Sequence, residues 1–565
     1  MKSKIILEGR GIFMKIISRK ILVLVLSLVF CVNLFTGCSQ NDGTEADKDI
    51  ASNGLVATPA PTPDDSSTKD DPKETSIYPL EGNPKLTYWV GLASNVTSFA
   101  TNFSELPFRQ NMEKATGIQV EYIHPPAGQE LETLNVLLAS GDYPDIIEYA
   151  WPGYPGGVMK LFNDGVMHEL IDLMGQYAPN INAYYEANPE IARQVKSDDG
   201  KFYLVPFIRG SKELRHTSGP VLRSDWLTAA GLEAPKTTAE WETVLTAFKE
   251  QQDCSAPFTG SLDHIRRVFI SAFDIGQDFY PDNNIVKYGP AEDGYKEFLT
   301  TMADWYAKGL VDPNLATVDR TIQDSNMTTG KGGSTYAAGG GQMGPYISTA
   351  QTENPEYNLV STTFPTKNTG EKPKFMNSFE FTSNGHAIIT TSCENLEVAM
   401  RFLDYARSEE GYTLYNFGVE GESFNYVDGI PTYSDLIMKN PDGLSVAQAM
   451  SKYCLANVNE PFTQALEYIQ QYYETSQQKQ ALVNWSDSDE NTSVLPPITF
   501  TPEESAEIAK IMSEINTYRD EMTMKIIMGS EPVSNVDVFQ TTIKSMNIDR
   551  VIALYQETLD RYYAR

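Results

Sequence analysis

The chain has 565 residues and a net charge of −31, because 75 Asp and Glu residues outnumber 44 Lys and Arg residues. Such an acidic balance repels nucleic acid and anionic surfaces, so nucleic acid is not an expected partner; a local basic cleft within an acidic whole is the alternative. The length exceeds what one hydrophobic core supports and predicts two lobes or more.

An export signal is the first predicted element. Basic residues after Met14 precede an almost wholly apolar run from 21 to 35. This order is typical of a secretory signal peptide, and the run is short for a helix that must cross about 30 Å of hydrocarbon. Residues 34–38, Leu-Phe-Thr-Gly-Cys, resemble the bacterial lipobox, although Phe35 stands where that pattern prefers Leu. The resemblance implies cleavage after residue 37 and acylation of Cys38.

Residues 38–78 are predicted to form a disordered linker. They are poor in apolar residues and rich in Asp, Ser, Thr, Pro and Ala, a composition that cannot bury enough surface to fold. The linker is expected to hold the remaining chain away from the membrane. A secreted protein without lipid and an uncleaved anchor are the alternatives to acylation, and Met14 is the alternative to Met1 as the start.

The cysteines and histidines show no metal-ligand spacing. The three cysteines beyond Cys38, at 254, 393 and 454, are widely separated and predict isolated buried thiols, with one disulfide as the alternative. The turn at 198–201 superficially resembles a calcium loop but lacks the further acidic ligands, so a surface turn is expected. No cofactor and no metal is therefore expected.

Strands and helices alternate from Lys85 onward. The pattern predicts strands at 86–90, 118–122 and 145–149, with helices at 103–115 and 131–140 between them. This alternation indicates a parallel sheet covered by helices. Ligands bind beyond the carboxyl ends of such strands, which here means the turn at 151–157.

Further along, the chain is mostly helical. Helices are predicted at 237–250, 295–309, 398–408 and 501–529, the last opened by a capping box; a strand is predicted at 386–389 and a hairpin at 426–430. Residues 339–344 match G-x-G-x-x-G, but Pro345 follows directly, so a dinucleotide site is rejected. A flexible crossover that touches a cleft, with Tyr336 at its edge, is the expected structure.

Residues 141–147, Gly-Asp-Tyr-Pro-Asp-Ile-Ile, resemble a segment of the extracellular solute-binding proteins of ABC sugar importers. The chain is most similar to the large family 1 lipoproteins of Gram-positive bacteria. Four further stretches carry the resemblance, at 223–227, 305–313, 402–429 and 495–497. Their order and spacing extend it over nearly all of residues 85–565.

This resemblance implies an α/β fold of the periplasmic-binding-protein type, rich in helices, in which two lobes close over a ligand by a hinge. The signal peptide would span 1–37 and the solute-binding domain 79–565. Its first lobe is expected at 79–205 plus 330–390, and its second at 206–329 plus 391–565. The resemblance also implies an oligosaccharide or related sugar as ligand and ABC permease subunits as partners. The protein is then a non-enzymatic monomer, lipid-anchored on the outer face of the cell membrane.

Aromatic rings at strand ends suit sugars because pyranose C–H faces stack on them, while carboxylates and guanidinium groups bond the hydroxyls. The candidate ligand-binding residues are Trp151, Tyr154, Arg223, Asp225, Trp226, Phe273 and Tyr336. Loop packing is the alternative for the first two. An internal ion pair is the alternative for Arg223 with Asp225, and a core position is the alternative for Trp226.

Two other classes of function remain open from sequence. An exported polysaccharide-degrading enzyme would need two carboxylates placed on either side of a glycosidic bond. No catalytic residue is expected, because acidic residues are too common here to single out such a pair. A surface adhesin or sensor partner is the third class.

Overall fold

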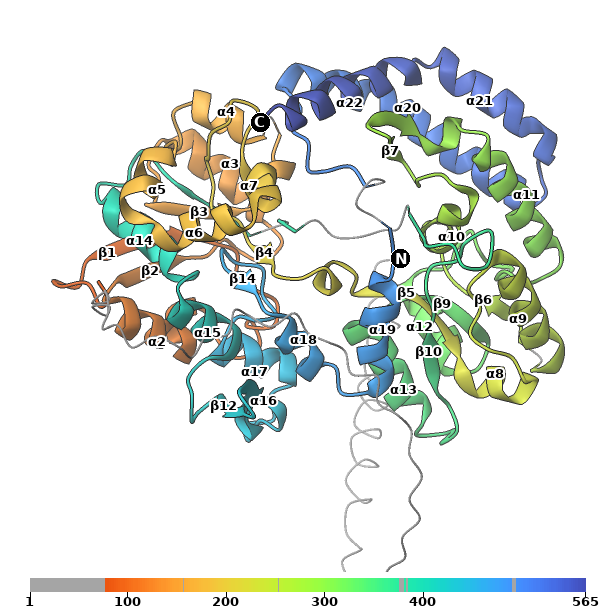
Figure 1. Cartoon of the computed structure of the whole chain (residues 1–565), viewed down its shortest axis with the longest axis horizontal. Coiled ribbons are helices and arrows are strands. Elements are labelled where there is room, and N and C mark those ends of the chain that lie inside the picture. The colour runs from red at the N-terminus through yellow and green to blue at the C-terminus, as the bar shows by residue number, and fades with distance from the viewer. Residues whose placement is uncertain (1–76, 156, 253, 375–380, 383–384, 490–493) are drawn as a thin grey trace, which may run out of the picture. The chain divides into compact units, whose positions relative to one another are not determined.

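A computed structural model describes residues 77–565, except 156, 253, 375–380, 383–384 and 490–493. The signal segment, Cys38 and nearly all of the predicted linker lie outside the described residues. The described residues form two α/β lobes, each built on its own four-stranded sheet (Figure 1). The lobe that begins at residue 77 is called the first lobe.

The sheet of the first lobe has the strand order β11-β3-β1-β2. Its strands are β1 (Lys85–Trp89), β2 (Gln119–Ile123), β3 (Ile146–Tyr149) and β11 (His386–Ile389). The first three are parallel, and β11 runs antiparallel to β3. Helices α2 (Pro107–Thr116) and α3 (Glu130–Ser140) connect the parallel strands, and each ends at a left-handed glycine, Gly117 or Gly141. The predicted alternation of strand and helix is confirmed.

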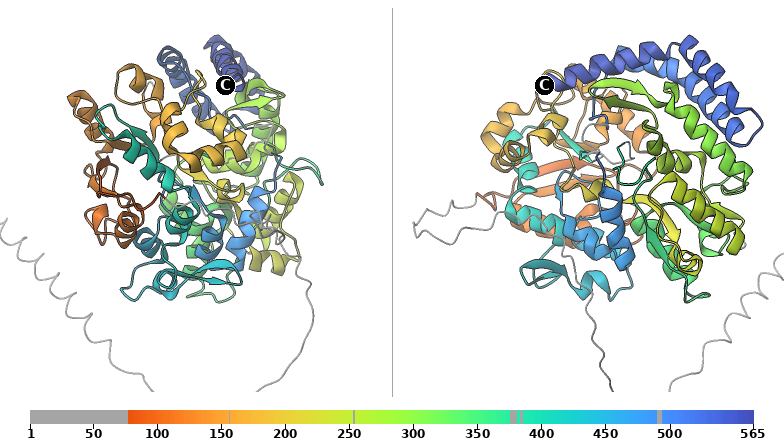
Figure 2. Two further views of the ribbon diagram at one scale, coloured as in Figure 1. Left: turned by 60° about the vertical axis from the view of Figure 1, so that its left-hand side comes forward. Right: turned by 45° about the vertical axis from the view of Figure 1, so that its right-hand side comes forward.

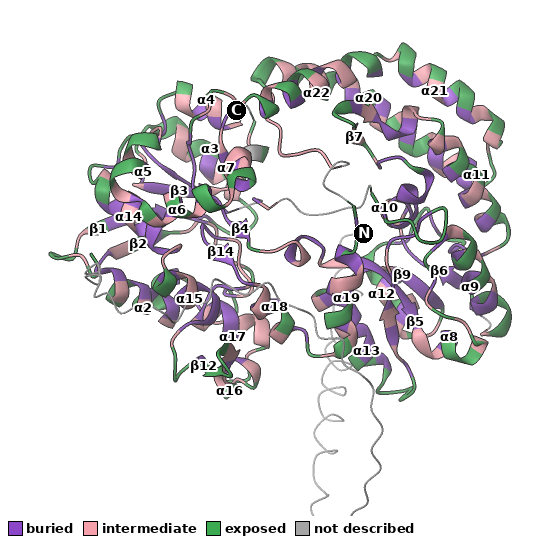
Figure 3. Cartoon of the chain, in the orientation of Figure 1, coloured by how far each residue is buried: buried purple, intermediate pink, exposed green. Residues whose placement is uncertain are grey.

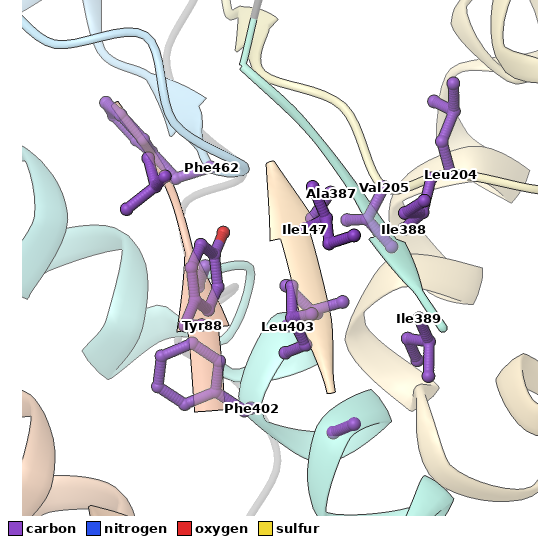
Figure 4. Packing of buried hydrophobic residues seen from close by; sticks show 14 of the residues in the cluster. Tyr88, Ile147, Leu204, Val205, Ala387, Ile388, Ile389, Phe402, Leu403 and Phe462 are labelled. Atoms are coloured by element: carbon purple, nitrogen blue, oxygen red, sulfur yellow. The ribbon is translucent and has the colours of Figure 1, made fainter. Parts of the chain in front are cut away.

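The core of the first lobe lies between this sheet and α14 (Leu396–Tyr405). Ile147, Ala387 and Ile388 are fully buried, and Phe402 and Leu403 from α14 pack against the same strands (Figure 4). Ile146 and Ile147 of β3 are both fully buried although they point to opposite faces, because a central strand is covered on both faces.

The sheet of the second lobe has the order β10-β5-β9-β6. Its strands are β5 (Ser218–Arg223), β6 (Ala256–Phe258), β9 (Gly332–Ala338) and β10 (Leu359–Ser361). Strand β6 is parallel to β9, whereas β5 is antiparallel to both β9 and β10. Its aromatic core is built around Phe269, whose ring meets Trp241 and Trp305 edge to face, each at 5.1 Å.

The C-terminal helices belong to the second lobe. Ile515, Phe539 and Val551 from α20 (Pro502–Ile527), α21 (Val536–Ser545) and α22 (Ile548–Tyr563) share its core. Figure 2 shows these blue helices against the green α11 (Gly294–Ala307), and Figure 3 shows their outer faces exposed. In the part of the chain that the structure describes, no helix is both long and apolar enough to cross a membrane.

The remaining helices and strands complete the two lobes. In the first lobe they are α4 (Gly157–Asn163), α5 (Ile171–Tyr177), α6 (Pro179–Ala187), α7 (Pro189–Val195), β4 (Ile208–Arg209), α15 (Glu409–Phe417), β12 (Phe424–Val427), β13 (Ile430–Tyr433), α16 (Asp435–Met438), α17 (Val446–Tyr453), β14 (Thr463–Gln464) and α18 (Leu466–Tyr472). In the second lobe they are α8 (Ser224–Ala230), α9 (Thr238–Gln251), α10 (Leu262–Phe269), β7 (Phe279–Asp282), β8 (Ile285–Tyr288), α12 (Arg320–Thr328), α13 (Gly344–Ala350) and α19 (Ser476–Ser486).

The assignment of segments to lobes differs from the expected one. The chain passes between lobes after β4, after β10 and again before α19. Strands β9 and β10 pair with β5, so residues 332–361 lie in the second lobe and not the first. Helices α14 and α15 pack in the core of the first lobe. They belong to the range 391–565, which had been expected in the second lobe. Within the range 391–565, α19 and the C-terminal helices α20 to α22 pack in the second lobe, as expected.

The Gly-rich turn also differs from the expected flexible crossover. Residues Gly339–Met343 form a single π-helical turn directly after β9. A Cβ at Gly339 would lie 2.4 Å from the Tyr473 hydroxyl, and one at Gly340 would lie 2.8 Å from the Tyr472 ring. Glycine is therefore needed here for close packing rather than for motion. The three predicted thiols, Cys254, Cys393 and Cys454, are buried and free, as expected.

Candidate ligand-binding site

The carboxyl edge of the first sheet is where an open α/β sheet places ligands. A pocket of about 510 Å³ lies at this edge, a volume within the usual range for small-molecule sites. It begins with the turn after β3 and the start of α4. A larger pocket of about 710 Å³ is lined by Lys85, Thr87 and Asp145 at the amino ends of β1 and β3. That second pocket lies at the opposite edge, so the first is the candidate site.

Four distant parts of the sequence build the candidate pocket. Tyr154 comes from the turn after β3, Gln194 from the end of α7, and His386 from the first position of β11. Ile498 and Phe500 come from the segment that precedes α20. The walls therefore combine apolar and aromatic side chains with a few polar groups, the usual composition of a ligand pocket.

Trp151 and Tyr154 occupy different layers of this edge. Trp151 is fully buried, and its indole N–H donates to the Ile147 carbonyl at 3.4 Å. The Tyr154 ring meets the Trp151 ring edge to face at 5.7 Å and is half-buried, with its hydroxyl donating to Asn135 at 2.9 Å. Tyr154 therefore lines the pocket, whereas Trp151 is buried and packs against the Tyr154 ring.

His386 is the most buried polar residue of the pocket wall, with 2% of its surface exposed. Burial lowers the pKa of its imidazole to about 4, and a hydrogen bond with the Tyr149 backbone opposes this shift only in part. The ring is therefore neutral at physiological pH. Its Nδ1 and the Oε1 of Gln194 have no hydrogen-bond partner among the described residues.

Sequence reasoning missed His386 and Gln194. Both lie outside any motif, and His386 was included only in a predicted apolar strand. The available signal was a polar residue inside that buried strand, since a buried polar group demands a partner.

An ionic network holds the far wall of the pocket. Arg561 and Arg565 both donate to the Asp198 carboxylate, at 3.0 and 2.6 Å, and both also donate to Thr499. Arg561 in addition makes a two-bonded pair with Glu504 in the first turn of α20. Asp198 thus lies in a turn bound by guanidinium groups. Among the described residues no group of three or more His, Cys, Asp or Glu side chains is placed to hold a metal ion.

Tyr336 lies at the carboxyl end of β9 in the second lobe. Strand β6 is parallel to β9, so its carboxyl end and the start of α10 lie at the same edge. The Tyr336 ring stacks on His264 with centroids 5.6 Å apart, and the Arg267 guanidinium lies 5.8 Å from the ring. Because Tyr336 is half-buried, this cluster offers an aromatic face beside polar groups.

Arg223, Asp225 and Trp226 lie at the other end of the same sheet. Ser218 pairs with Ala338 near Tyr336, whereas Arg223 is at the far end of β5 and pairs with Leu359. The Arg223 guanidinium lies 4.1 Å from the Trp226 ring and donates to Asp225 at 2.8 Å. The internal ion pair considered as the alternative is therefore formed.

Phe273 is also largely buried, with its ring 5.8 Å from that of Phe298. A ligand-binding role for Phe273, Arg223, Asp225 and Trp226 stays a prediction. Their burial and the internal ion pair do not favour it.

Comparison with known proteins identifies the family. Residues 94–413 match the bacterial extracellular solute-binding protein family. The chain belongs to this family. Its members are substrate-binding proteins and not enzymes. The prediction of a non-enzymatic solute-binding protein is therefore confirmed, and the alternative of a polysaccharide-degrading enzyme is not supported.

Among curated relatives, this solute-binding protein is similar to the fructooligosaccharide ABC transporter substrate-binding protein FusA of Streptococcus pneumoniae. The two are 28% identical over 268 residues, which cover 44% of this chain and 48% of FusA. It is 24% identical to the polygalacturonan/rhamnogalacturonan-binding protein YtcQ of Bacillus subtilis, over 63% of this chain and 72% of YtcQ. The match to FusA thus spans about half of that relative's length.

A solved structure of the alginate-binding protein AlgQ2 without calcium ion has a similar fold. The TM-score is 0.65 at 23% identity, covering 86% of this chain and 99% of AlgQ2. This likeness confirms the predicted two-lobed, periplasmic-binding-protein-like fold.

Proposed function

We propose that this solute-binding protein captures an oligosaccharide outside the cell and delivers it to the permease of an ABC importer. The observation that carries the proposal is the pocket at the carboxyl edge of the first sheet, with the Tyr154 ring on its wall. Sugar C–H faces stack on such rings, and hydroxyls match the polar groups beside them. The names of FusA and YtcQ, which are carbohydrate-binding proteins, support the same ligand class.

Tyr336 is proposed to supply the matching surface of the second lobe. Its ring lies at the carboxyl edge of the parallel pair β6 and β9, as Tyr154 lies at the carboxyl edge of the first sheet. A ligand that touches both lobes favours their closed arrangement, because it binds that arrangement more tightly than the open one. The permease would then recognise the closed form.

Oligosaccharide binding is expected to raise the melting temperature of the mature chain by about 2–5 °C at a ligand concentration of 100 times Kd. The measurement is a thermal-shift screen with neutral and uronic oligosaccharides, kestose and trigalacturonate among them, followed by chromatography of the incubated sugar. Tyr154→Ala and Tyr336→Ala should each weaken binding several-fold, consistent with about 1 kcal/mol for a lost aromatic contact.

Tyr563→Ala is the matched control, because Tyr563 is 46% exposed on α22 and is not part of either edge. Its affinity should equal that of the wild type. Shortened sugars after incubation would indicate hydrolysis, and the absence of any response across the screen would favour the adhesin or sensor class.

The lipid anchor is part of the same proposal and rests on the lipobox-like residues 34–38. In a Gram-positive host, the wild-type chain should incorporate labelled palmitate and sediment with membranes, whereas Cys38→Ser should do neither. Sedimentation of both proteins with membranes would instead indicate an uncleaved anchor. Recovery of the unlabelled wild type from the medium would indicate a secreted protein without lipid.

A further inference from the structure

Two arginines near the end of α22 connect the second lobe to the first. Arg561 Nε and Arg565 Nη2 donate to the Asp198 carboxylate at 3.0 and 2.6 Å. Arg565 also donates to the Arg193 backbone carbonyl at 3.4 Å. The Arg565 side chain is 0% exposed and that of Asp198 is 25% exposed, so salt screens their contact less than it screens a surface pair. Asp198, Arg561 and Arg565 are called the interlobe ion cluster.

Each side of the interlobe ion cluster is fixed to its own lobe. Asp198 lies in the turn between α7 and Phe202, which both contribute to the first-lobe core. Tyr555 of α22 stacks on Phe279 of β7 with ring centroids 3.9 Å apart, and the Phe500 ring packs on Tyr555 at 4.8 Å. Helix α22 and the segment before α20 are thus both tied to the second lobe. A rotation of one lobe against the other must therefore change the distances between Asp198 and the two guanidinium groups.

The same arginines bond a residue of the candidate pocket wall. Arg561 donates to the Thr499 carbonyl at 3.4 Å, and Arg565 donates to the Thr499 hydroxyl at 3.2 Å. Thr499 lines the pocket from the second lobe, whereas Tyr154 and Lys196 line it from the first. The pocket therefore has a wall from each lobe, and the interlobe ion cluster connects these walls.

We infer that Asp198, Arg561 and Arg565 are positioning residues, which hold the two walls at the separation that accepts an oligosaccharide and so raise its affinity without touching it. The inference rests on the proposed carbohydrate function. None of these three described residues lines the pocket. A ligand that contacts both walls binds the arrangement in which they are close, and its apparent Kd rises as the population of that arrangement falls. Contacts that favour this arrangement therefore strengthen binding from outside the pocket.

The test compares Asp198→Asn, Asp198→Glu and Arg565→Gln with the wild type in isothermal titration calorimetry. The probe is the sugar that raises the melting temperature most in the thermal-shift screen, with kestose and trigalacturonate tried first. Asp198→Asn removes the charge with little change in shape and should raise Kd about two- to thirtyfold, the range for changes that alter coupling between distant sites. Asp198→Glu keeps the charge and should recover part of this loss. Asp198→Asn combined with Arg565→Gln should raise Kd by less than the product of the single effects, because both remove the same contact.

Glu507→Gln is the matched control. It removes an ion pair of similar geometry, in which Nε and Nη2 of Arg550 both donate to the Glu507 carboxylate at 3.0 Å. This pair joins α20 to α22 within the second lobe, so its loss should leave Kd equal to that of the wild type.

Small-angle X-ray scattering separates positioning from a loss of folded structure. Without sugar, Asp198→Asn should have a larger radius of gyration than the wild type, and saturating sugar should bring both proteins to the same value. A Kd equal to that of the wild type in both Asp198→Asn and Arg565→Gln, with a wild type that binds sugar, would overturn this inference and leave the proposed function intact. If Asp198→Asn does not fold, Arg565→Gln decides alone, since Arg565 lies beyond the end of α22. A wild type that binds no sugar would overturn both proposals.

Discussion

Replacing Glu460 with Ala should lower the free energy of unfolding by about 3–5 kcal/mol, the usual cost of removing one partner from a buried ion pair. Glu460 pairs with Arg109 in the first lobe, and each side chain is only 4% exposed. The Arg109 guanidinium lies over the rings of Phe103 and Tyr122, at 4.7 and 4.9 Å. Without the carboxylate, a desolvated positive charge would remain among aromatic rings.

A neighbouring carboxyl group, Glu148, limits the loss of stability expected in Glu460→Ala. Burial, and next the negative charge of Glu460, raise the pKa of Glu148 well above its usual value, which favours the neutral form of this carboxyl group. The Tyr88 hydroxyl donates to it at 2.7 Å. In Glu460→Ala the repulsion is removed and Glu148 can ionise, which keeps the expected loss nearer the lower end of the range.

Urea denaturation followed by far-ultraviolet circular dichroism measures this loss. Asp164→Ala is the control, because it removes an exposed ion pair with Lys160 and should change stability by an amount near zero. The double variant Arg109→Met with Glu460→Leu should recover most of the stability, since apolar residues of similar volume often replace a buried pair without cost. A Glu460→Ala protein as stable as the Asp164→Ala control would contradict the buried pair.

The substitution Gly219→Ala, which adds one methyl group, is expected to lower the free energy of unfolding of the second lobe by about 1–3 kcal/mol. A Cβ at this position of β5 would lie 2.3 Å from Cδ1 of Trp485. The Trp485 side chain is fully buried against the sheet, and its N–H donates to the Pro220 carbonyl at 3.2 Å. The indole therefore cannot move aside without losing packing and a hydrogen bond.

Trp485→Ala should cost about 3–5 kcal/mol, because a large cavity forms under α19. The double variant with Gly219→Ala should cost less than the sum of the two single changes, since the methyl group then enters vacated space. Gly175→Ala in α5 is the control: no atom lies within 4 Å of its Cβ position, so a gain of about 0.5–1 kcal/mol is expected in a helix. Strict additivity would mean that α19 does not pack on β5.

Local signals were sufficient for many element boundaries. The predicted capping box is formed, with Thr501 Oγ1 accepting from the Glu504 N–H at 3.2 Å and Glu504 accepting from the Thr501 N–H at 2.8 Å. The predicted hairpin turns at Asp428 and Gly429, whose φ angles of 51° and 79° suit an Asp-Gly turn. Both features depend on residues a few positions apart, which is why sequence predicts them.

Strand partners could not be predicted in the same way. Residues 330–390 were expected in the first lobe, yet residues 332–338 form strand β9, which pairs with β5 and β6 in the second. Its local sequence, Gly-Gly-Ser-Thr-Tyr-Ala-Ala, consists mostly of small residues, which can pack in a buried strand of either sheet. The choice depends on contacts such as Gly333 against Phe248, where a Cβ would approach the ring to 2.4 Å.

The sequence by itself determined the family, the alternation of strands and helices in the first lobe, and the sheet edge at which Tyr154 lies. Only the tertiary structure decided that Trp151 is buried while Tyr154 lines the pocket, and that Arg223 forms an ion pair with Asp225. It also decided that His386 and Gln194 line the same pocket as Tyr154. The reason is physical. Strand and turn patterns arise between near neighbours in the chain, whereas burial and bonding capacity depend on which distant segments the fold brings together.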